Sequence, residues 1–283
     1  MRGRGGFIGA NVTPASAAIN SAASGVWTVR EAEAMRRAGT WPSATEVPAQ
    51  IAGLQLWLDA ADGSTLFDAT TGGSIVAANG TVMRWEDKSG NGLHCTESSN
   101  GPQRKTAQIN GRDIVRFNGT NTQLQGTSTP TTGNARTTFV VAKSNTSAGG
   151  EILQIGKDRT GGAGFLHRAL FLSGNTFFGG DLYVNNLTIS GAQLPITSAF
   201  VGCIVQSSTS SIQYFHNATS YEVTGTLNSF SMNPGYLIGK ARSDKDFGFF
   251  NGDICEVIAY GAALSSSNRA AVESYLMTKW GIT

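Results

Sequence analysis

Short apolar runs separated by polar, glycine-rich segments dominate the chain from residue 51 onward. The run at 54–59 is rich in leucine and contains a tryptophan, and the runs at 135–145 and 198–208 contain valine and phenylalanine, residue types that are enriched in strands. About ten to twelve strands are expected at this spacing, with turns between them. The pattern predicts an all-β domain, and a count of this size fits an antiparallel two-sheet jelly-roll sandwich.

The end of the chain combines a strand with a helix. Residues 254–260 are apolar at nearly every position, which predicts a central strand covered on both faces. Gly261 separates this strand from a helical pattern of apolar positions at Leu264, Val272, Tyr275, Leu276 and Trp280. We expect a C-terminal capping helix that begins at Ser265 or Ser266, ends at Gly281 and covers one face of the sandwich.

A different pattern precedes residue 51. Residues 1–25 are rich in glycine, alanine, serine and asparagine and have too few apolar groups to fold alone. Thr28 and Glu31 have the spacing of a helical capping box and Gly39 is a stop signal, so a short helix is expected between them. Such a helix is marginal by itself. We therefore predict assembly contacts for the apolar residues of this arm, which are Phe7, Ile8, Trp27, Met35 and Trp41.

A linker rich in proline, serine and threonine at 42–48 joins this arm to the rest of the chain. The sequence therefore divides into an extended arm with a short helix at 1–50 and a sandwich domain at 51–283.

Three motifs in the second part resemble bacterial and phage laminin G-like domains, which have the concanavalin A-like jelly roll. They are LQLWLDAADGSTLFD at 54–68, VMRWEDKSGNGLHCTES at 82–98 and NGDICEVIAYGAALSSSNRAAVESYLMTKWGI at 251–282. They occur in the order that the family has. The resemblance implies a concanavalin A-like sandwich over the whole of 51–283.

The arm carries a second resemblance. The segment ASGVWTVREAEAMRRAGTWP at 23–42, preceded by GFIGA, is similar to a short module of tailed-phage structural proteins. In those proteins the module lies near the N-terminus or beside a fibre or decoration domain. The resemblance implies an attachment or assembly role for residues 1–50.

Composition excludes several classes of function. The formal charge of +2 is too small to indicate a nucleic-acid partner. No window approaches the roughly 18 consecutive apolar residues of a spanning helix, and the N-terminus lacks the apolar core of a signal peptide. We expect no membrane role and synthesis without export by the general secretory route.

Three cysteines, Cys95, Cys203 and Cys255, cannot all pair within one chain. Cys203 and Cys255 lie in apolar, strand-like runs, so the favoured interpretation is buried free thiols in a reducing compartment. A bridge between Cys203 and Cys255 is the alternative.

Carboxylates offer one weak metal hypothesis. Asp59, Asp62 and Asp68 lie in and after the first strand, where they could supply oxygen ligands to Ca²⁺. The favoured alternative is a turn in which these side chains cap backbone groups. No other cofactor is predicted.

No catalytic constellation is evident. A hydrolase on this fold needs two carboxylates facing one cleft, but Glu151 and Glu256 are isolated and Glu86 and Asp87 point to opposite faces of a strand. The three histidines are far apart and have no metal-ligand spacing around them. We expect no enzymatic activity.

Binding of sugars is a stronger hypothesis. Exposed aromatics with asparagine and aspartate form sugar sites on jelly rolls, and such mixtures occur at 175–186, 213–221 and 243–253. The candidate glycan-binding residues are Phe178, Asp181, Tyr183, Asn185, Tyr214, His216 and Phe247. The alternative is that most of these aromatics belong to the core, because alternation sends half of each strand inward.

These observations predict a non-enzymatic structural protein of a tailed-phage virion, assembled in the bacterial host cytoplasm. A capsid decoration, cement or adaptor protein is favoured, because the sequence has no fibrous shaft repeats. The alternatives are a tail-fibre or receptor-binding protein, or a lectin module that contacts host surface glycans; a divergent glycosidase ranks third. The expected partners are other virion proteins, bound through the arm, and further copies of the chain, with a trimer favoured.

Overall fold

The computed structural model describes residues 28, 30, 31, 47–131, 133, 135–146, 150–155, 168–173, 176–181, 188–189, 196–208, 211–221, 223–224, 235–240 and 248–283. The chain forms two compact units, Met1–Gln50 and Ile51–Thr283. Within the described residues, no helix has the length and apolar character needed to cross a membrane.

The first unit contains the predicted capping box. The side chain of Glu31 accepts hydrogen bonds from the backbone N–H of Thr28 at 2.8 Å and from its hydroxyl at 2.7 Å, and the Thr28 hydroxyl accepts from the N–H of Glu31 at 3.2 Å. The short helix α2 (Val47–Gln50) ends this unit. The five apolar residues predicted for assembly, Phe7, Ile8, Trp27, Met35 and Trp41, lie outside the described residues.

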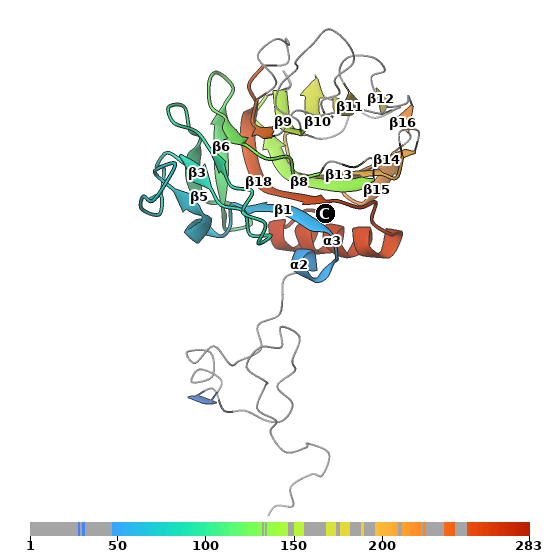
Figure 1. Cartoon of the computed structure of the whole chain (residues 1–283), viewed down its shortest axis with the longest axis horizontal. Helices are drawn as coiled ribbons and strands as arrows, with labels where there is room; N and C mark the ends of the chain where they lie inside the picture. Colours follow the sequence, from blue (N-terminus) through green and yellow to red (C-terminus); the bar gives the residue numbers. More distant parts are fainter. Residues whose placement is uncertain are drawn as a thin grey trace, which may run out of the picture. The chain divides into compact units, whose positions relative to one another are not determined.

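The second unit is a sandwich of two antiparallel sheets, as the sequence predicted (Figure 1). The first sheet has the order β15-β14-β13-β8-β18-β6-β5, and β1 pairs with β18 beside this path. Its strands are β1 (Leu54–Asp59), β5 (Gln103–Ile109), β6 (Arg112–Asn118), β8 (Arg136–Ser144), β13 (Phe200–Gln206), β14 (Ile212–His216), β15 (Thr219–Tyr221) and β18 (Asn251–Tyr260).

The second sheet has the order β11-β10-β9-β17-β7-β4-β3-β2. Its strands are β2 (Leu66–Phe67), β3 (Arg84–Trp85), β4 (Cys95–Thr96), β7 (Leu124–Gly126), β9 (Gly150–Ile155), β10 (Arg168–Ser173), β11 (Thr176–Asp181) and β17 (Tyr236–Ile238). Three further short elements are the 3₁₀ turn η1 (Gly63–Thr65) and the strands β12 (Thr188–Ile189) and β16 (Val223–Thr224), which pair with each other.

Strand β18 is central in the first sheet, as its continuous apolar sequence predicted. It pairs with β8 along one side, and on the other side with β6 through residues 251–254 and with β1 through residues 256–260. The register shifts between Ile254 and Glu256, where the carbonyl of Cys255 accepts a hydrogen bond from the N–H of Ala60 at 2.9 Å. Every residue of β18 after Asn251 is buried.

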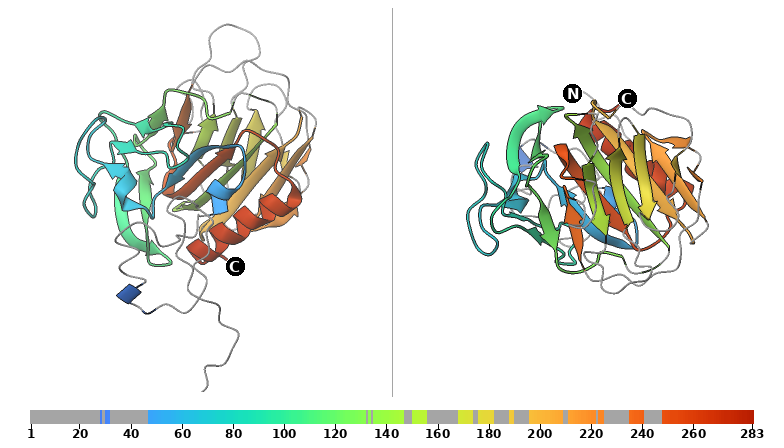
Figure 2. Two further views of the ribbon diagram at one scale, coloured as in Figure 1. Left: turned by 60° about the horizontal axis from the view of Figure 1, so that its bottom comes forward. Right: turned by 90° about the horizontal axis from the view of Figure 1, so that it is seen from above.

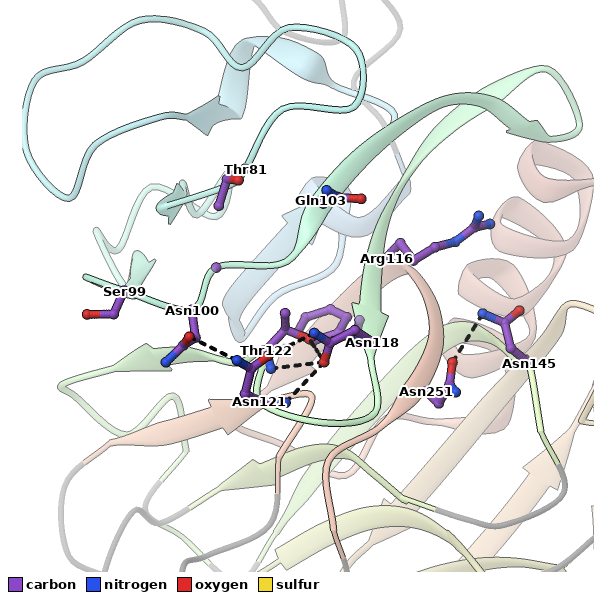
Figure 3. A pocket seen from close by; sticks show the side chains of 12 residues that line it. Thr81, Ser99, Asn100, Gln103, Arg116, Asn118, Asn121, Thr122, Asn145 and Asn251 are labelled. Carbon is purple, nitrogen blue, oxygen red and sulfur yellow. Dashed lines mark hydrogen bonds between the residues drawn. The ribbon is translucent and has the colours of Figure 1, made fainter.

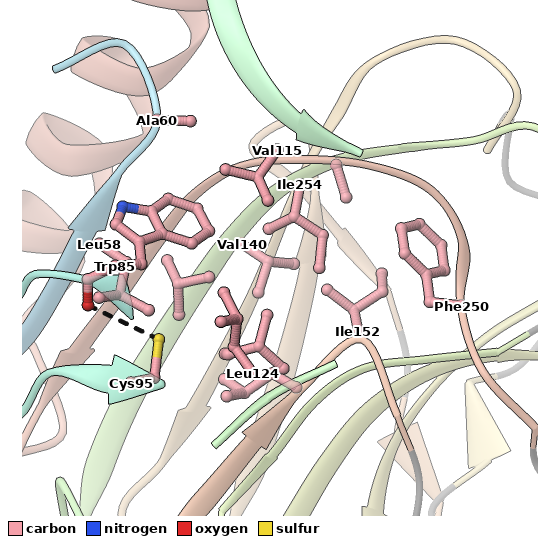
Figure 4. Close-up of a cluster of buried hydrophobic side chains, with 14 of the residues drawn as sticks. Leu58, Ala60, Trp85, Cys95, Val115, Leu124, Val140, Ile152, Phe250 and Ile254 are labelled. Atoms are coloured by element: carbon pink, nitrogen blue, oxygen red, sulfur yellow. Dashed lines mark hydrogen bonds between the residues drawn. The ribbon is translucent and has the colours of Figure 1, made fainter. Parts of the chain in front are cut away.

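The two sheets enclose one apolar core (Figure 4). The first sheet contributes alternate residues of β1, β8 and β18, among them Leu58, Val140 and Ile254. The second sheet contributes Trp85 and Leu124. Trp85 is fully buried and belongs to this core. Each fully buried large side chain stabilises the fold by roughly 1.5–3 kcal/mol.

Helix α3 (Ser266–Trp280) covers the outer face of the first sheet, opposite the second sheet (Figures 1 and 2). Ser265 is its N-cap, since its hydroxyl accepts from the N–H of Asn268 at 3.3 Å. Gly281 ends it in the left-handed conformation at φ 65°. The helix buries Val272, Leu276 and Trp280, so the capping role predicted for it is confirmed.

The motif at 82–98 forms a hairpin of β3 and β4 whose loop is built around Asp87. One carboxylate oxygen accepts hydrogen bonds from the N–H groups of Trp57 at 2.9 Å and Ser89 at 2.8 Å. The other accepts from the Ser89 hydroxyl at 2.7 Å and the N–H of Leu93 at 3.0 Å, while His94 Nδ1 accepts from the N–H of Asp87. A buried carboxylate with four donors therefore ties this loop to β1.

Candidate functional site

A polar cavity of about 410 Å³ opens beside the ends of β6 and β18 (Figure 3). We call it the amide pocket, because amide side chains predominate in its lining. It is lined by Thr81, Ser99, Asn100, Gly101, Gln103, Arg116, Phe117, Asn118, Asn121, Thr122, Asn145 and Asn251. Its size falls within the range of roughly 300–1,000 Å³ that is usual for small-molecule sites.

Sheet register places two of the asparagines at the centre of the pocket. Asn118 ends β6 and Asn251 begins β18, and the two are paired across the strands. Gly119 follows with φ 72°, and a Cβ atom added there would lie 2.6 Å from the Cβ of Asn251. A glycine is therefore required for the chain to leave β6 beside Asn251 and form the pocket loop.

One wall of the pocket is a chain of hydrogen-bonded amides. The Oδ1 atom of Asn118 accepts from the N–H groups of Thr120 at 2.9 Å and Asn121 at 3.1 Å, and from the Thr122 hydroxyl at 3.1 Å. Its Nδ2 donates to Asn121 Oδ1 at 2.8 Å, and Asn121 Nδ2 donates to Asn100 Oδ1 at 3.1 Å. These contacts orient the amides before any ligand arrives, and the Nδ2 group of Asn100 ends the chain.

The opposite wall comes from Asn145 and Asn251. The N–H of Asn145 donates to the carbonyl of Asn251 at 2.9 Å, and their side chains meet at 3.5 Å. The contacts among the described residues leave Asn145 Oδ1 and Asn251 Nδ2 without a further partner. The pocket therefore offers both an acceptor and a donor from these two residues, which Figure 3 shows as a group separate from the amide chain.

The charges around the pocket nearly cancel. Among the described lining residues Arg116 alone is charged, and its guanidinium forms a fork with Asp253, with Nε to Oδ1 at 2.6 Å and Nη2 to Oδ2 at 2.9 Å. Hydrogen bonding to Asp253 raises the pKa of Arg116. Glu97 lies behind the loop of Ser99. Burial by itself would raise the pKa of its carboxyl group, but hydrogen bonds from Gln123 and from backbone N–H groups outweigh burial, so the pKa is lowered. Glu97 therefore keeps its negative charge close to the pocket.

A second polar group lies under helix α3, and we call it the carboxylate–lysine cluster: Asp59, Lys88, Glu256 and Lys279. Asp59 and Glu256 are paired across β1 and β18. Lys279 Nζ lies 2.8 Å from each carboxylate, and Lys88 Nζ lies 2.9 Å from Asp59. The expectation that Glu256 is isolated is therefore wrong, because it considered spacing within one strand and this pair forms between residues 197 positions apart in the sequence (256 − 59).

The cluster is closed to a substrate. Asp59 is 2% exposed and Glu256 is fully buried. The indole N–H groups of Trp57 and Trp280 donate to the two oxygens of Glu256 at 2.8 Å and 2.7 Å. Burial, together with the charge of Asp59, raises the pKa of Glu256 to about 7. The contacts of Lys279 and Trp280 join helix α3 to the first sheet, which is a structural role.

The residues predicted to bind glycans do not gather at one described site. Tyr214 and His216 lie on β14 and are only 1% and 3% exposed, so neither presents a face on which a sugar could stack. They were expected on the surface, but strand alternation and the cover of β15 place them inside, with His216 stacked on Phe200. Phe178 and Asp181 lie in β11, of which the structure describes the backbone and not the side chains. Tyr183, Asn185 and Phe247 lie outside the described residues.

The three aspartates proposed for calcium have other partners. Asp59 is held by lysines, as above, and its Oδ1 accepts from the N–H of Ala61 at 3.1 Å. Asp62 caps η1 through the N–H of Ser64, and Asp68 accepts from the N–H of Ser74 at 2.7 Å. These are the backbone-capping roles of the alternative interpretation. Over the described part of the chain, no cluster of three or more His, Cys, Asp or Glu side chains could hold a metal ion.

Other titratable groups are buried in the sandwich. Cys95, Cys203 and Cys255 are all free and buried, so the free-thiol interpretation is confirmed and the Cys203–Cys255 bridge is absent. Burial raises the pKa of the Cys95 thiol to about 12. Glu151 on β9 is fully buried, its two oxygens have no hydrogen-bond partner among the described residues, and burial raises its pKa well above the usual value.

The amide pocket was not predicted from the sequence. Its asparagines come from the loop before β5, the end of β6, the loop after β8 and the start of β18, so no sequence window contains the site. The segment NGTN at 118–121 was the one local signal, because asparagine and glycine at a strand end favour a side-chain-capped turn.

No protein-family profile matches the sequence, and no curated protein matches it. Among solved structures, Trypanosoma rangeli sialidase in complex with sialic acid has a similar fold, with a TM-score of 0.54 at 14% identity over 86% of this chain and 35% of that chain. A GH54 α-L-arabinofuranosidase soaked with a cyclic sulfate inhibitor has a TM-score of 0.54 at 13% identity over 84% of this chain and 61% of that chain. The binding domain of botulinum neurotoxin serotype D has a TM-score of 0.52 at 10% identity over 83% of this chain and 55% of that chain.

The chain spans about a third to three fifths of the length of these proteins. At identities of 10% to 14% the likeness concerns the fold. The second unit of this chain therefore has the β-sandwich fold that also occurs in sialidase, arabinofuranosidase and toxin-binding-domain structures.

Proposed function

We propose that this chain is a carbohydrate-binding module that acts without catalysis, and that the amide pocket is its binding site. The observation that carries the proposal is the oriented set of amides on both walls of the pocket. A sugar hydroxyl both donates and accepts hydrogen bonds, and a side-chain amide offers both functions at fixed positions. Orientation before binding reduces the entropy lost when the ligand is held.

The pocket also sets the expected strength of binding. Phe117 is the one aromatic residue in the described part of the lining and is fully buried, so these residues offer no aromatic face for stacking. Hydrogen bonds to neutral hydroxyls alone contribute little net energy, and a dissociation constant on the order of 1 mM is expected for one sugar unit. Display of many copies on one particle would raise the apparent affinity by avidity.

Absence of catalysis is part of the proposal. Two described carboxylates touch the pocket lining: Asp253, which is 1% exposed and bound to Arg116, and Glu97, which accepts from the N–H of Ser99 from behind its loop. The paired carboxylates Asp59 and Glu256 are buried beneath Trp280. A hydrolase needs an acid and a nucleophile or base that reach the same glycosidic bond, and neither arrangement supplies them. Release of free sugar by the purified chain would contradict this part.

Binding is tested on an array of immobilised glycans with the full-length chain. Asn100→Ala and Gln103→Ala, which remove one amide each from the pocket lining, should lower binding several-fold. Gln108→Ala is the matched control, because Gln108 is exposed on the same strand β5 but lies outside the amide pocket. Chelation of metal ions should leave binding unchanged. Equal losses for Gln103→Ala and Gln108→Ala, or no binding to any glycan, would contradict the proposal.

We propose that the module belongs to a tailed-phage particle and that residues 1–50 attach it there. Support comes from the sequence resemblance at 23–42 and from the capping box of Thr28 and Glu31. A decoration or adaptor protein is favoured over a tail fibre, and a trimer over a monomer. Trp27→Ala combined with Trp41→Ala in the full chain should abolish incorporation into particles while glycan binding persists. Full incorporation of that variant would contradict the attachment role.

A further inference from the structure

We infer that the amide pocket selects neutral sugars and rejects acidic ones, and that the Arg116–Asp253 pair determines this selectivity. The inference rests on the proposed function, because it concerns the ligand of the same pocket. Its basis is the state of Arg116, the one cation among the lining residues that the structure describes.

Arginine recognises an acidic sugar by presenting a planar fork of two N–H groups to the sugar carboxylate. In this pocket the fork of Arg116 is already occupied by a carboxylate of the protein, at 2.6 Å and 2.9 Å. Asp253 is held opposite Arg116 by the pairing of β18 with β6, and its side chain is 1% exposed while that of Arg116 is 34% exposed. The pair is thus fixed by the sheet and anchored from the buried side.

A ligand carboxylate would therefore meet a neutralised cation. It would also approach the negative charges of Asp253 and of Glu97, which lies behind the loop of Ser99 and accepts from the N–H groups of Ser98 and Ser99 at 2.9 Å and 3.1 Å. Lys143 on β8 is paired with Asp253 on β18, but its side chain lines a different cavity and not the amide pocket. The acidic ligand gains no charge partner and loses part of its hydration.

A neutral sugar meets no such cost. The fork uses Nε and Nη2 of Arg116, and the contacts among the described residues leave Nη1 for a ligand. With the amides of Asn100, Asn145 and Asn251, the pocket presents donors and acceptors that match hydroxyl groups. The chemistry of the lining therefore fits a neutral, polyhydroxylated sugar.

Matched ligand pairs test this inference on the full-length chain: lactose against sialyllactose, and galactose against galacturonic acid, measured by calorimetry or on the array. The wild type should prefer the neutral member of each pair by about tenfold or more, a difference of about 1.4 kcal/mol. Its affinity for the neutral sugar should not change between low and high salt, because no net charge is paired on binding.

Asp253→Asn is the decisive variant, because it keeps the shape of the side chain and frees the charge of Arg116. It should gain affinity for the acidic member of each pair, in a salt-dependent way. The double variant Asp253→Asn with Arg116→Gln has no free cation and should lose that gain. Melting curves check that each variant is folded, and the salt dependence of the wild type provides a test that does not depend on any variant.

The outcomes separate the two proposals. Wild-type binding to acidic sugars that equals or exceeds binding to neutral ones overturns the selectivity and leaves the binding function standing. The same holds if folded Asp253→Asn shows no gain for acidic sugars. Failure of the wild type to bind any member of these pairs, or any glycan on the array, overturns both proposals.

Discussion

At the residue scale, Glu256 shows why a buried charge can be essential to a fold without contributing to catalysis. Its two oxygens accept from two different indoles, those of Trp57 and Trp280, and its charge faces Lys279. A glutamine has one oxygen and one NH₂ group, so it can satisfy only one of the two indole donors. The replacement also removes one of the two carboxylates that face Lys279, so the buried lysine keeps only Asp59 as a charge partner, and losing part of a buried ion-pair network is strongly destabilising.

We therefore predict that Glu256→Gln lowers the free energy of unfolding by roughly 3–5 kcal/mol. The matched control is Glu86→Gln, since Glu86 pairs with Arg84 at 3.1 Å but its side chain is 35% exposed. Solvent screening limits such a pair to about 1 kcal/mol or less. Urea unfolding curves measure both. Equal losses for the two variants would contradict the role given to Glu256.

His216 provides a pH-dependent test at the same scale. Burial lowers its pKa from 6.5 to about 4. The unfolded chain therefore takes up a proton between pH 6.5 and 4 that the folded chain does not, so this contribution to stability is complete above pH 6.5 and is lost as the pH falls towards 4. At about 1.4 kcal/mol per pH unit, the loss is on the order of 3 kcal/mol.

The variant His216→Phe keeps a ring that stacks on Phe200 and has nothing to protonate. Relative to this variant, the wild type should lose stability steadily as the pH is lowered through that window, with no relative change above it. Thermal melting at a series of pH values measures the difference. A difference that is independent of pH would mean that His216 is protonated equally in the folded and unfolded chain.

At the element scale, the closing helix illustrates what local sequence can predict. The N-cap Ser265, the C-cap Gly281 and the buried Leu276 and Trp280 follow from spacing alone. The polar half of the interface does not, because Glu256, Asp59 and Lys279 meet only when β1 pairs with β18. Local rules thus predict the helix and its apolar face, but the ion pairs beneath it depend on strand pairings that are distant in sequence.

We predict that Trp280→Ala lowers the free energy of unfolding by roughly 3–5 kcal/mol, as large-to-small core changes do. Trp280→Phe should cost less, because it keeps most of the apolar volume and loses the hydrogen bond to Glu256. Trp41→Ala, in the first unit, should leave the melting of the sandwich unchanged. If Trp280→Ala melts at the wild-type temperature, the helix does not stabilise the sandwich.

The loops show what local sequence cannot predict. The Asn-Gly signal at Asn91 predicts a hairpin, and β3 does pair with β4. The four donors that converge on Asp87 include the backbone of Trp57, 30 positions away, which no turn rule contains. The same holds for the amide pocket, whose walls are joined by the pairing of Asn118 with Asn251. Prediction of sugar residues from aromatic character failed at Tyr214 and His216, since sequence does not tell which alternate residues of a strand face inward.

At the scale of the whole molecule, a sandwich that carries the amide pocket is joined to an arm whose sequence resembles a phage assembly module. The carboxylate–lysine cluster and helix α3 hold one face of the first sheet. The pocket lies at the ends of β6 and β18, so its geometry depends on the same central strand. A weak pocket on a module that is repeated over a particle would bind a glycan-covered surface through many contacts at once.

The central claim is that the amide pocket holds the sugar, and NMR titration of side-chain amide signals in the full-length chain tests it most directly. A neutral sugar that binds on the array is added in steps, and each asparagine signal is assigned by single replacement. The account predicts saturable shifts for the amides of Asn100, Asn121 and Asn251, with a common dissociation constant, and none for Gln108. Saturable shifts that spare those asparagines and occur elsewhere in the sandwich would contradict it.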